Sequence, residues 1–522
     1  MRRSLPVMAS VVAFALAAGC ADEEAPCPSG VRGDAGSCVC PNGAMPVDGF
    51  CWEEPEPLPA DAGPVDAFVP DAGPPDAPTA LGWDLATREA RLGRVLALSA
   101  DGRVLAASAD ATPGDRGVTD ERGPAGIQIF ERGAFAWSHR ATLPRPDAAG
   151  HPTWGAALAL SGDGATLAVA APNEPGPGDE PSGAVYVYVR GDDGWALDAT
   201  LISPAPTADA FGRALAFDVS GDVLVVGAPE DASAATEVDG DASDTSAPGT
   251  GAAHVFVREA GEADEADGRW AHAAYLKAPT EGARGVGGAV ALSADASRIA
   301  LAAWRSPSAA AGVHVFVREG GRWRAEARVL PAGLADHDDF GVGLALDAAG
   351  ETLAVGAPGE ASDATGVGGD PTRDTSASGA SGAVWVFARG EDGWAEAAYL
   401  KAANADGRDR FGMAVALASD GDRLAVGAPG ESGSGEGMDP LDDDDAPAAG
   451  AVYLFERSGA RWAQAAYVKP MGTRAEDGFG RQLALGRVGR RLASSVPTRT
   501  LPLGRTSAGT PNAGLLFVYD LD

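Results

Sequence analysis

The chain has 522 residues, of which 74 are acidic and 40 basic, so its formal net charge is −34. Nucleic acids and anionic membranes bind clustered Lys and Arg. This charge balance therefore argues against a nucleic-acid partner. Hydrophobic residues make up 45% of the chain, which is enough for a sizeable core.

The N-terminal 19 residues have the features of an export signal. Arg2 and Arg3 precede a short apolar run that ends at Cys20. The run is too short to span a membrane comfortably and has the form of a signal h-region. Its end, LAAGC, resembles the bacterial lipobox, whose cysteine is lipid-modified. We therefore expect residues 1–19 to be a lipoprotein signal peptide, with an ordinary signal peptide as the alternative. A lipid anchor on Cys20 would place the protein in a bacterial cell envelope, at the outer membrane or the cell surface.

The other four cysteines lie in a small module, residues 20–52, as two pairs of equal spacing. Four cysteines allow three pairings, and the duplication favours the disulfides Cys27–Cys38 and Cys40–Cys51. An exported compartment permits such bridges. A metal site is the alternative, although a C-x-C pair alone indicates it weakly.

Residues 53–80 are rich in Pro, Asp and Ala and show no apolar period. This composition predicts a disordered tether. From residue 81 to the end, apolar and polar residues alternate in short stretches bounded by Gly, Asp and Pro, which is typical of antiparallel strands.

A residue pair ending in Gly recurs seven times in residues 81–522. The pairs are Leu92-Gly93, Trp154-Gly155, Phe211-Gly212, Val286-Gly287, Phe340-Gly341, Phe411-Gly412 and Phe479-Gly480. Each unit reads as four short strands. In the first six units the fourth strand begins near a tryptophan: Trp137, Trp195, Trp270, Trp323, Trp394 and Trp462. Four-stranded units repeated around an axis form a propeller. We therefore predict an all-β fold, a seven-bladed β-propeller of four-stranded antiparallel blades, preceded by the disulfide-rich module and the disordered linker.

The seventh unit lacks a fourth strand, because the chain stops at Asp522 without a further Trp. Trp83 lies at the beginning of the repeat region and belongs to no other unit. We therefore expect residues 81–88 to complete the last blade, which would remove open sheet edges.

The repeated words resemble the FG-GAP repeats of integrin α-chain β-propellers and their bacterial relatives. The FG word stands at Phe211, Phe340, Phe411 and Phe479, and the GAP word at Gly227, Gly356 and Gly427. The resemblance covers residues 81–522 and implies the propeller fold. It says little about function, because one scaffold carries many functions. We interpret the words as blade framework: the ring packs between blades and the glycine permits close backbone approach.

In integrin-like repeats the hairpin between FG and GAP often carries a calcium loop rich in Asp. The equivalent turns here hold only one or two carboxylates each, so we expect no Ca²⁺ at them. Acidic residues gather instead in the loops that follow GAP. Solvated loops are the simpler interpretation, and Ca²⁺ or a cationic partner are the alternatives. The candidate metal ligands are Glu237, Asp239, Asp241, Asp244, Glu360, Asp363, Asp370 and Asp374.

No catalytic motif stands out, because none of the six histidines has metal-ligand spacing and no cysteine follows residue 51. We therefore favour a non-catalytic binding or adhesion module that contacts an extracellular protein or glycan through its acidic loops. Two alternatives stay open. One is a carbohydrate-active or other hydrolase or lyase with paired carboxylates at the propeller axis. The other is a structural component of the envelope.

Overall fold

The computed structural model describes most of the repeat region and two short segments near the N-terminus. The described residues are 31–32, 38–39, 79–81, 90–111, 126–133, 136–146, 153–174, 182–204, 209–259, 269–280, 282–303, 312–373, 379–440, 443–497 and 514–521. Within these ranges the chain forms strands and turns, and no helix there has the length and hydropathy to cross a lipid bilayer. The chain divides into two compact units, Met1–Val65 and Asp66–Asp522.

In the first unit, β1 (Val31–Arg32) pairs antiparallel with β2 (Cys38–Val39). The predicted signal peptide and the lipidation site Cys20 lie outside the described residues. The side chains of the two predicted disulfides also lie outside them, so both pairings stay predictions.

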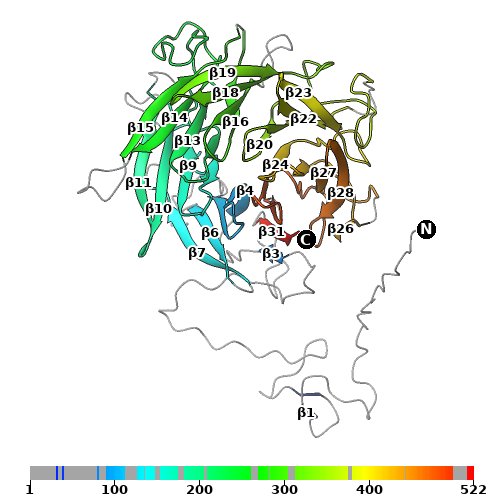
Figure 1. Cartoon of the computed structure of the whole chain (residues 1–522). Helices are drawn as coiled ribbons and strands as arrows, with labels where there is room; N and C mark the ends of the chain where they lie inside the picture. Colours follow the sequence, from blue (N-terminus) through cyan, green and yellow to red (C-terminus); the bar gives the residue numbers. More distant parts are fainter. Residues whose placement is uncertain are drawn as a thin grey trace, which may run out of the picture. The chain divides into compact units, whose positions relative to one another are not determined.

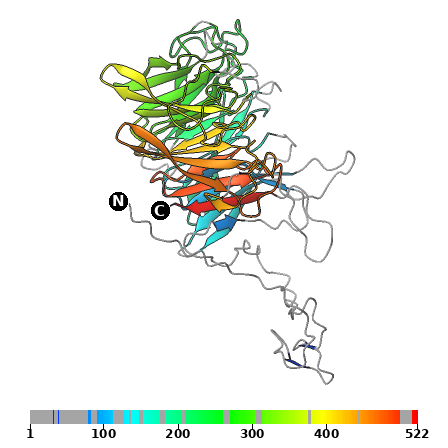
Figure 2. The same ribbon diagram turned by 90° about the vertical axis from the view of Figure 1, so that its right-hand side faces the viewer.

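The second unit is a seven-bladed β-propeller, which confirms the fold predicted from the repeats. Each blade is an antiparallel sheet of four strands, and the sixth carries a further two-residue strand at its outer edge. Figure 1 shows the blades following one another around a ring, and Figure 2 shows the ring from the side. The first strand of each blade lies innermost, because these strands line the axial cavity described below.

The first four blades contain the strands β4 to β19 in chain order. Blade one has β4 (Ala90–Leu98), β5 (Val104–Ala111), β6 (Gly126–Arg132) and β7 (Trp137–Pro144). Blade two has β8 (Leu158–Leu160), β9 (Thr166–Ala171), β10 (Ala184–Gly191) and β11 (Gly194–Ile202). Blade three has β12 (Leu215–Phe217), β13 (Val223–Ala228), β14 (Ala252–Glu259) and β15 (Arg269–Leu276). Blade four has β16 (Val286–Leu292), β17 (Arg298–Ala303), β18 (Val313–Glu319) and β19 (Arg322–Val329).

The last three blades include the one that closes the ring. Blade five has β20 (Gly343–Leu346), β21 (Thr352–Ala357), β22 (Ala383–Gly390) and β23 (Gly393–Leu400). Blade six has β24 (Ala414–Leu417), β25 (Arg423–Ala428), β27 (Ala451–Ser458), β28 (Arg461–Lys469) and the short β26 (Gly437–Met438). Blade seven has β29 (Leu483–Leu485), β30 (Arg491–Val496), β31 (Leu515–Asp520) and β3 (Thr79–Leu81).

The two ends of the propeller meet in blade seven. Its outer strand is β3, which pairs antiparallel with β31 in the register Ala80 to Phe517. The labels β3 and β31 lie side by side in Figure 1. The described strand that completes the last blade is Thr79–Leu81, which shares Leu81 with the expected segment 81–88. Residues 82–89, including Trp83, lie outside the described part of the chain.

The FG and GAP words lie where neighbouring blades come closest. All seven FG glycines have positive φ, between 78° and 99°. The N–H of Gly412 donates to the carbonyl of Gly427 in its own blade at 3.0 Å. A Cβ on Gly412 would overlap the carbonyl oxygen of Ala383 in the preceding blade, and a Cβ on Gly356 would overlap that of Gly412. Only glycine fits both positions without backbone movement.

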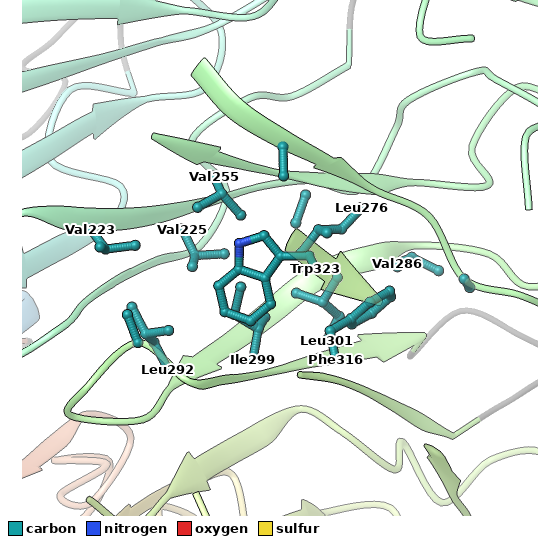
Figure 3. Packing of buried hydrophobic residues seen from close by; sticks show 14 of the residues in the cluster. Val223, Val225, Val255, Leu276, Val286, Leu292, Ile299, Leu301, Phe316 and Trp323 are labelled. Atoms are coloured by element: carbon teal, nitrogen blue, oxygen red, sulfur yellow. The ribbon is translucent and has the colours of Figure 1, made fainter. Parts of the chain in front are cut away.

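The aromatic ring of the FG word packs between two blades. Phe411 is fully buried and makes edge contacts with Tyr453 and Phe455 of its own blade, at centroid distances of 5.5 Å and 5.8 Å. On its other side it belongs to a cluster with Val384 and Leu400 of blade five. Figure 3 shows the corresponding core between blades three and four, where Trp323 lies among aliphatic side chains. These contacts explain why the words repeat once per blade.

A closed ring of backbone hydrogen bonds joins the seven turns between first and second strands. Each turn donates one N–H to a carbonyl of the next: Ala100 to Gly162, Gly162 to Val219, Val219 to Ala294, Ala294 to Ala348, Ala348 to Ser419, Ser419 to Arg487 and Arg487 to Ala100. The last bond, at 2.8 Å, joins blade seven to blade one. The ring therefore closes through hydrogen bonds as well as through β3.

The carboxylates of these turns act within the turns. Asp218 Oδ1 accepts the backbone N–H groups of Gly221, Asp222 and Val223, each at 3.0 Å. These are the hairpins at which the resemblance places a calcium loop. Such bonds favour a tight turn that presents its backbone to the next blade.

Candidate functional site

A cavity of about 460 Å³ lies on the propeller axis, where the inner strands begin. It continues along these strands as a second space of about 280 Å³. The walls come from β4, β8, β12, β16, β20, β24 and β29, so every blade contributes. The residue that follows the FG glycine lines this entrance in all seven units: Arg94, Ala156, Arg213, Gly288, Val342, Met413 and Arg481.

Three arginines, Arg94, Arg213 and Arg481, line the axial mouth. Each directly follows the glycine of an FG pair, in units one, three and seven. All three are exposed, and Val342 and Met413 occupy the same repeat position in units five and six. The repeat thus brings three positive charges to one place although they are separated by up to 387 residues (481 − 94) in the chain.

The charge of this mouth contrasts with the rest of the molecule. The described residues that line both spaces include no carboxylate, imidazole or thiol. Arg213 and Arg481 form none of the ion pairs found among the described residues, whereas framework arginines such as Arg298 are paired with glutamates. A cavity lined by guanidinium and apolar groups is suited to an anion, since arginine binds carboxylate, sulfate and phosphate through a planar fork.

The acidic loops after GAP lie on the same face as this mouth, since they connect the strand ends on the FG side. Most of the predicted metal ligands there accept local hydrogen bonds. Asp241 accepts from Ser243, Asp244 from Ala234 and Ser246, and Asp370 from Thr372. These bonds lower the pKa of all three carboxyls. The carboxylates therefore stabilise turns within their loops.

The remaining predicted ligands are dispersed. Asp239 accepts the N–H of Tyr275 at 2.9 Å, and Asp363 forms an ion pair with Arg373 at 3.3 Å. Glu237 is exposed, and Asp374 lies outside the described residues. In the described part of the chain these eight residues form no group of three ligands, so the Ca²⁺ hypothesis stays a prediction without geometric support.

Glu360 belongs to a buried ion pair that recurs in three blades. Its Oε2 accepts from Nζ of Lys401 at 2.6 Å, and both side chains are almost inaccessible to solvent. The equivalent pairs are Lys277 with Asp231 and Lys469 with Glu431. In each case the lysine is the last residue of the fourth strand or the one directly after it, and the acid follows GAP, so the pair holds the loop against the outer strand. Burial lowers the pKa of Lys277 and Lys469, and the facing carboxylate opposes this shift.

A second buried carboxyl, Asp409, precedes the FG pair of blade six. Burial, together with the charge of Glu431, raises its pKa to about 7. The unfolded value is about 3.9, so the folded state holds this proton over a wider pH range. The resulting stability is fully present below about pH 4 and is lost as the pH rises through about 7.

We therefore expect the stability of the wild type to fall between pH 4.5 and 8, by about 1–3 kcal/mol more than that of Asp409→Asn. Urea unfolding at a series of pH values measures the difference. The amide oxygen can still accept the N–H of Asp406, which now donates to Asp409 at 2.8 Å. A variant that loses stability as steeply as the wild type would show that Asp409 does not carry this dependence.

The axial arginines and the buried lysines were both missed in the sequence. A signal existed for each, because arginine follows three of the seven FG glycines and lysine follows Tyr275, Tyr399 and Tyr467 by two residues. Neither regularity reveals by itself which side chains meet an acid and which face a cavity.

Residues 394–455 match the FG-GAP repeat family. This stretch begins at the fourth strand of blade five, contains Phe411-Gly412 and Gly427, and ends in the third strand of blade six. No curated protein sequence matches the chain. An FG-GAP repeat within a seven-bladed propeller is consistent with a binding or adhesion module.

The chain is similar to solved structures that include the following two. The WD40 repeats of RRP9 share 12% identity, cover 83% of this chain and 95% of that chain, and give a TM-score of 0.47. The periplasmic gluconolactonase PpgL of Pseudomonas aeruginosa shares 19% identity, covers 73% of this chain and 86% of that chain, and gives a TM-score of 0.43.

Proposed function

We propose that this propeller with its FG-GAP repeat is a non-catalytic binding module of a bacterial envelope, tethered by a lipid on Cys20. Its ligand is an anionic group on an extracellular glycan or protein, bound at the axial mouth. The observation that supports this function is the convergence of Arg94, Arg213 and Arg481 on one cavity of about 460 Å³. A concave site with a few convergent polar groups is the usual form of a ligand pocket.

The size and surroundings of the mouth favour a single terminal anion over a long polyanion. The cavity accommodates a group of about monosaccharide size, in line with the usual range of ligand pockets. The acidic loops on the same face and the net charge of −34 oppose a polyanion at longer range. In this proposal the loops exclude unsuitable partners and the arginines bind the ligand. The proposed binding surface is therefore the axial mouth and not the acidic loops that the sequence suggested.

The hydrolase or lyase alternative requires paired carboxylates or an equivalent acid and base at the axis. The described residues that line the axial spaces supply positive charge and apolar surface instead. This lining supports binding without catalysis. The structural alternative predicts no ligand at all, so the experiment below also separates it from the proposal.

The test is calorimetric titration of the full chain with digalacturonic acid, glucose 6-sulfate and glucose 6-phosphate, with uncharged galactobiose and glucose for comparison. We expect at least one anionic probe to bind and the uncharged ones not to bind. The double variant Arg213→Gln, Arg481→Gln is expected to weaken binding about tenfold or more, which corresponds to about 1.4 kcal/mol.

Arg322→Gln is the matched control, because Arg322 is an exposed arginine at the outer hairpin of blade four. It should leave the affinity unchanged. Equal affinity in the double variant and the wild type would overturn the axial assignment. Absence of binding by all three anionic probes would favour the structural alternative.

A further inference from the structure

Three buried residues of blade three, Asp209, Asp231 and His254, bring their ligand atoms within 4.8 Å of one another. Their relative exposures are 0%, 1% and 0%. Asp209 precedes Phe211 in the loop that enters the blade, Asp231 follows β13, and His254 lies in β14. None of them lines the axial cavity or belongs to the set of metal ligands predicted from the sequence.

Blades five and six show what these positions normally hold. Glu360 and Glu431 replace Asp231 there, and both glutamates have hydrogen bonds to both carboxylate oxygens. At the position of His254, paired with the same residue of the second strand, blade five has Trp385 and blade six has Tyr453. Blade three therefore combines a shorter acid with an imidazole. Among the described residues, this is the one place where three possible metal ligands come together.

The two exchanges leave polar atoms without partners. Asp231 Oδ1 accepts from Nζ of Lys277, from the hydroxyl of Tyr275 and from the N–H of Ser233, each at 2.9–3.0 Å. Its other oxygen, Oδ2, has no hydrogen-bond partner and is buried, and the same holds for Nε2 of His254. A buried polar atom without a partner costs about 1–3 kcal/mol. Two such atoms beside a second buried carboxyl, that of Asp209, point to an occupant.

The imidazole is oriented for a ligand role. Nδ1 of His254 lies 3.1 Å from Nε2 of His272. When Nδ1–H donates to His272, the lone pair on Nε2 is available for a metal ion. Such a second hydrogen bond commonly fixes the tautomer of metal-binding histidines. The edge contact with Phe211, at a centroid distance of 5.6 Å, holds the ring in place.

We propose that Asp209, Asp231 and His254 bind one divalent transition-metal ion inside blade three, with Zn²⁺ as the best fit. Zn²⁺ accepts both carboxylate oxygen and imidazole nitrogen as ligands and needs only four donors, whereas Ca²⁺ takes six to eight oxygens. Bond lengths of about 2.0–2.1 Å require tetrahedral ligand atoms about 3.4 Å apart, which small side-chain rotations from the observed arrangement would give. The site goes beyond the axial binding function and is independent of it.

The test is binding of Co²⁺ and Zn²⁺ to the full chain, because Co²⁺ bound by nitrogen and oxygen ligands gives visible absorption bands. The site is buried, so the metal is supplied both to the folded protein and during refolding from urea after chelation. We expect one Co²⁺ per chain, displaced by one Zn²⁺, and a higher Tm of the zinc-loaded protein.

Two matched variants identify the site. His254→Phe inserts the residue that blade seven carries at this position, Phe517, so the fold is expected to persist while the cobalt bands and the zinc-dependent rise in Tm disappear. His314→Phe changes the equivalent buried histidine of blade four, where Arg284 replaces Asp209, and should leave both signals intact. No bands on refolding, or equal bands in His254→Phe and the wild type, would overturn the proposal. An increase in Tm of His254→Phe without metal, together with no zinc effect on the wild type, would also overturn the proposal.

Discussion

Lys401→Met is expected to lower the free energy of unfolding by about 3–5 kcal/mol, because it removes one member of a buried ion pair. Nζ of Lys401 donates to Glu360 at 2.6 Å, to the hydroxyl of Ser381 at 2.7 Å and to the carbonyl of Ser362 at 3.1 Å. The exposed fractions of the lysine and glutamate side chains are 0% and 2%. Without the ammonium group, the carboxylate of Glu360 stays buried without a counter-ion.

Urea unfolding, followed by tryptophan fluorescence, measures this loss. The control is Arg324→Ala, which breaks the pair with Glu319 at a site where both side chains are more than half exposed. An exposed pair contributes about 0–1 kcal/mol, so this variant should differ little from the wild type. The double variant Lys401→Met, Glu360→Gln should recover part of the loss, since no charge is then left buried. Equal stability of Lys401→Met and Arg324→Ala would contradict the structural role of the pair.

The repetition of this pair explains part of the acidity that the sequence shows. An acid after GAP recurs in blades three, five and six because a lysine at the end of the fourth strand needs a partner. Charge counts along the chain could not reveal this, since Glu360 and Lys401 are 41 residues apart. The sequence therefore suggested Glu360 as a metal ligand, whereas its neighbours in space make it part of the blade framework.

The fold itself was predictable from the sequence. Seven FG positions give the number of blades, and six tryptophans mark the fourth strands, each as the first or second residue of β7, β11, β15, β19, β23 and β28. The closing strand is indicated less clearly. Trp83 suggested residues 81–88 by analogy with the other units, and the described strand β3, Thr79–Leu81, overlaps that segment at Leu81. A three-residue strand held by backbone pairing with β31 leaves little side-chain pattern to recognise.

The two candidate sites differ in how far the sequence indicates them. Arginine after three FG glycines is visible once the repeats are aligned, and the propeller symmetry then brings these positions to one axis. The cluster in blade three depends on the length of one side chain, Asp231 in place of glutamate, and on one aromatic position that holds His254. In the aligned repeats, both residues look like ordinary variation between blades. Only the packing shows that they leave Asp231 Oδ2 and His254 Nε2 unpartnered.

Gly412→Ala is expected to destabilise the protein by about 3–5 kcal/mol, because backbone strain and a steric clash add at one position. Gly412 has a φ of 90°, and its new Cβ would overlap the carbonyl oxygen of Ala383 in blade five. That carbonyl belongs to β22, a buried strand paired on both sides, so it has little freedom to move.

Gly393→Ala separates the two effects, because Gly393 has a φ of 101° and no atom lies within 4 Å of its added Cβ. It carries the strain without the clash and should cost about 1–2 kcal/mol. Blades two and four have alanine in place of the GAP glycine, at Ala170 and Ala302, and there the FG glycine of the next blade faces a side-chain methyl group. Alanine thus replaces the GAP glycine in two blades of this chain, whereas the FG glycine is kept in all seven units. If urea unfolding gave equal losses for Gly412→Ala and Gly393→Ala, positive φ alone would account for the FG word. A larger loss for Gly412→Ala would show that the close approach of the neighbouring blade adds to the strain.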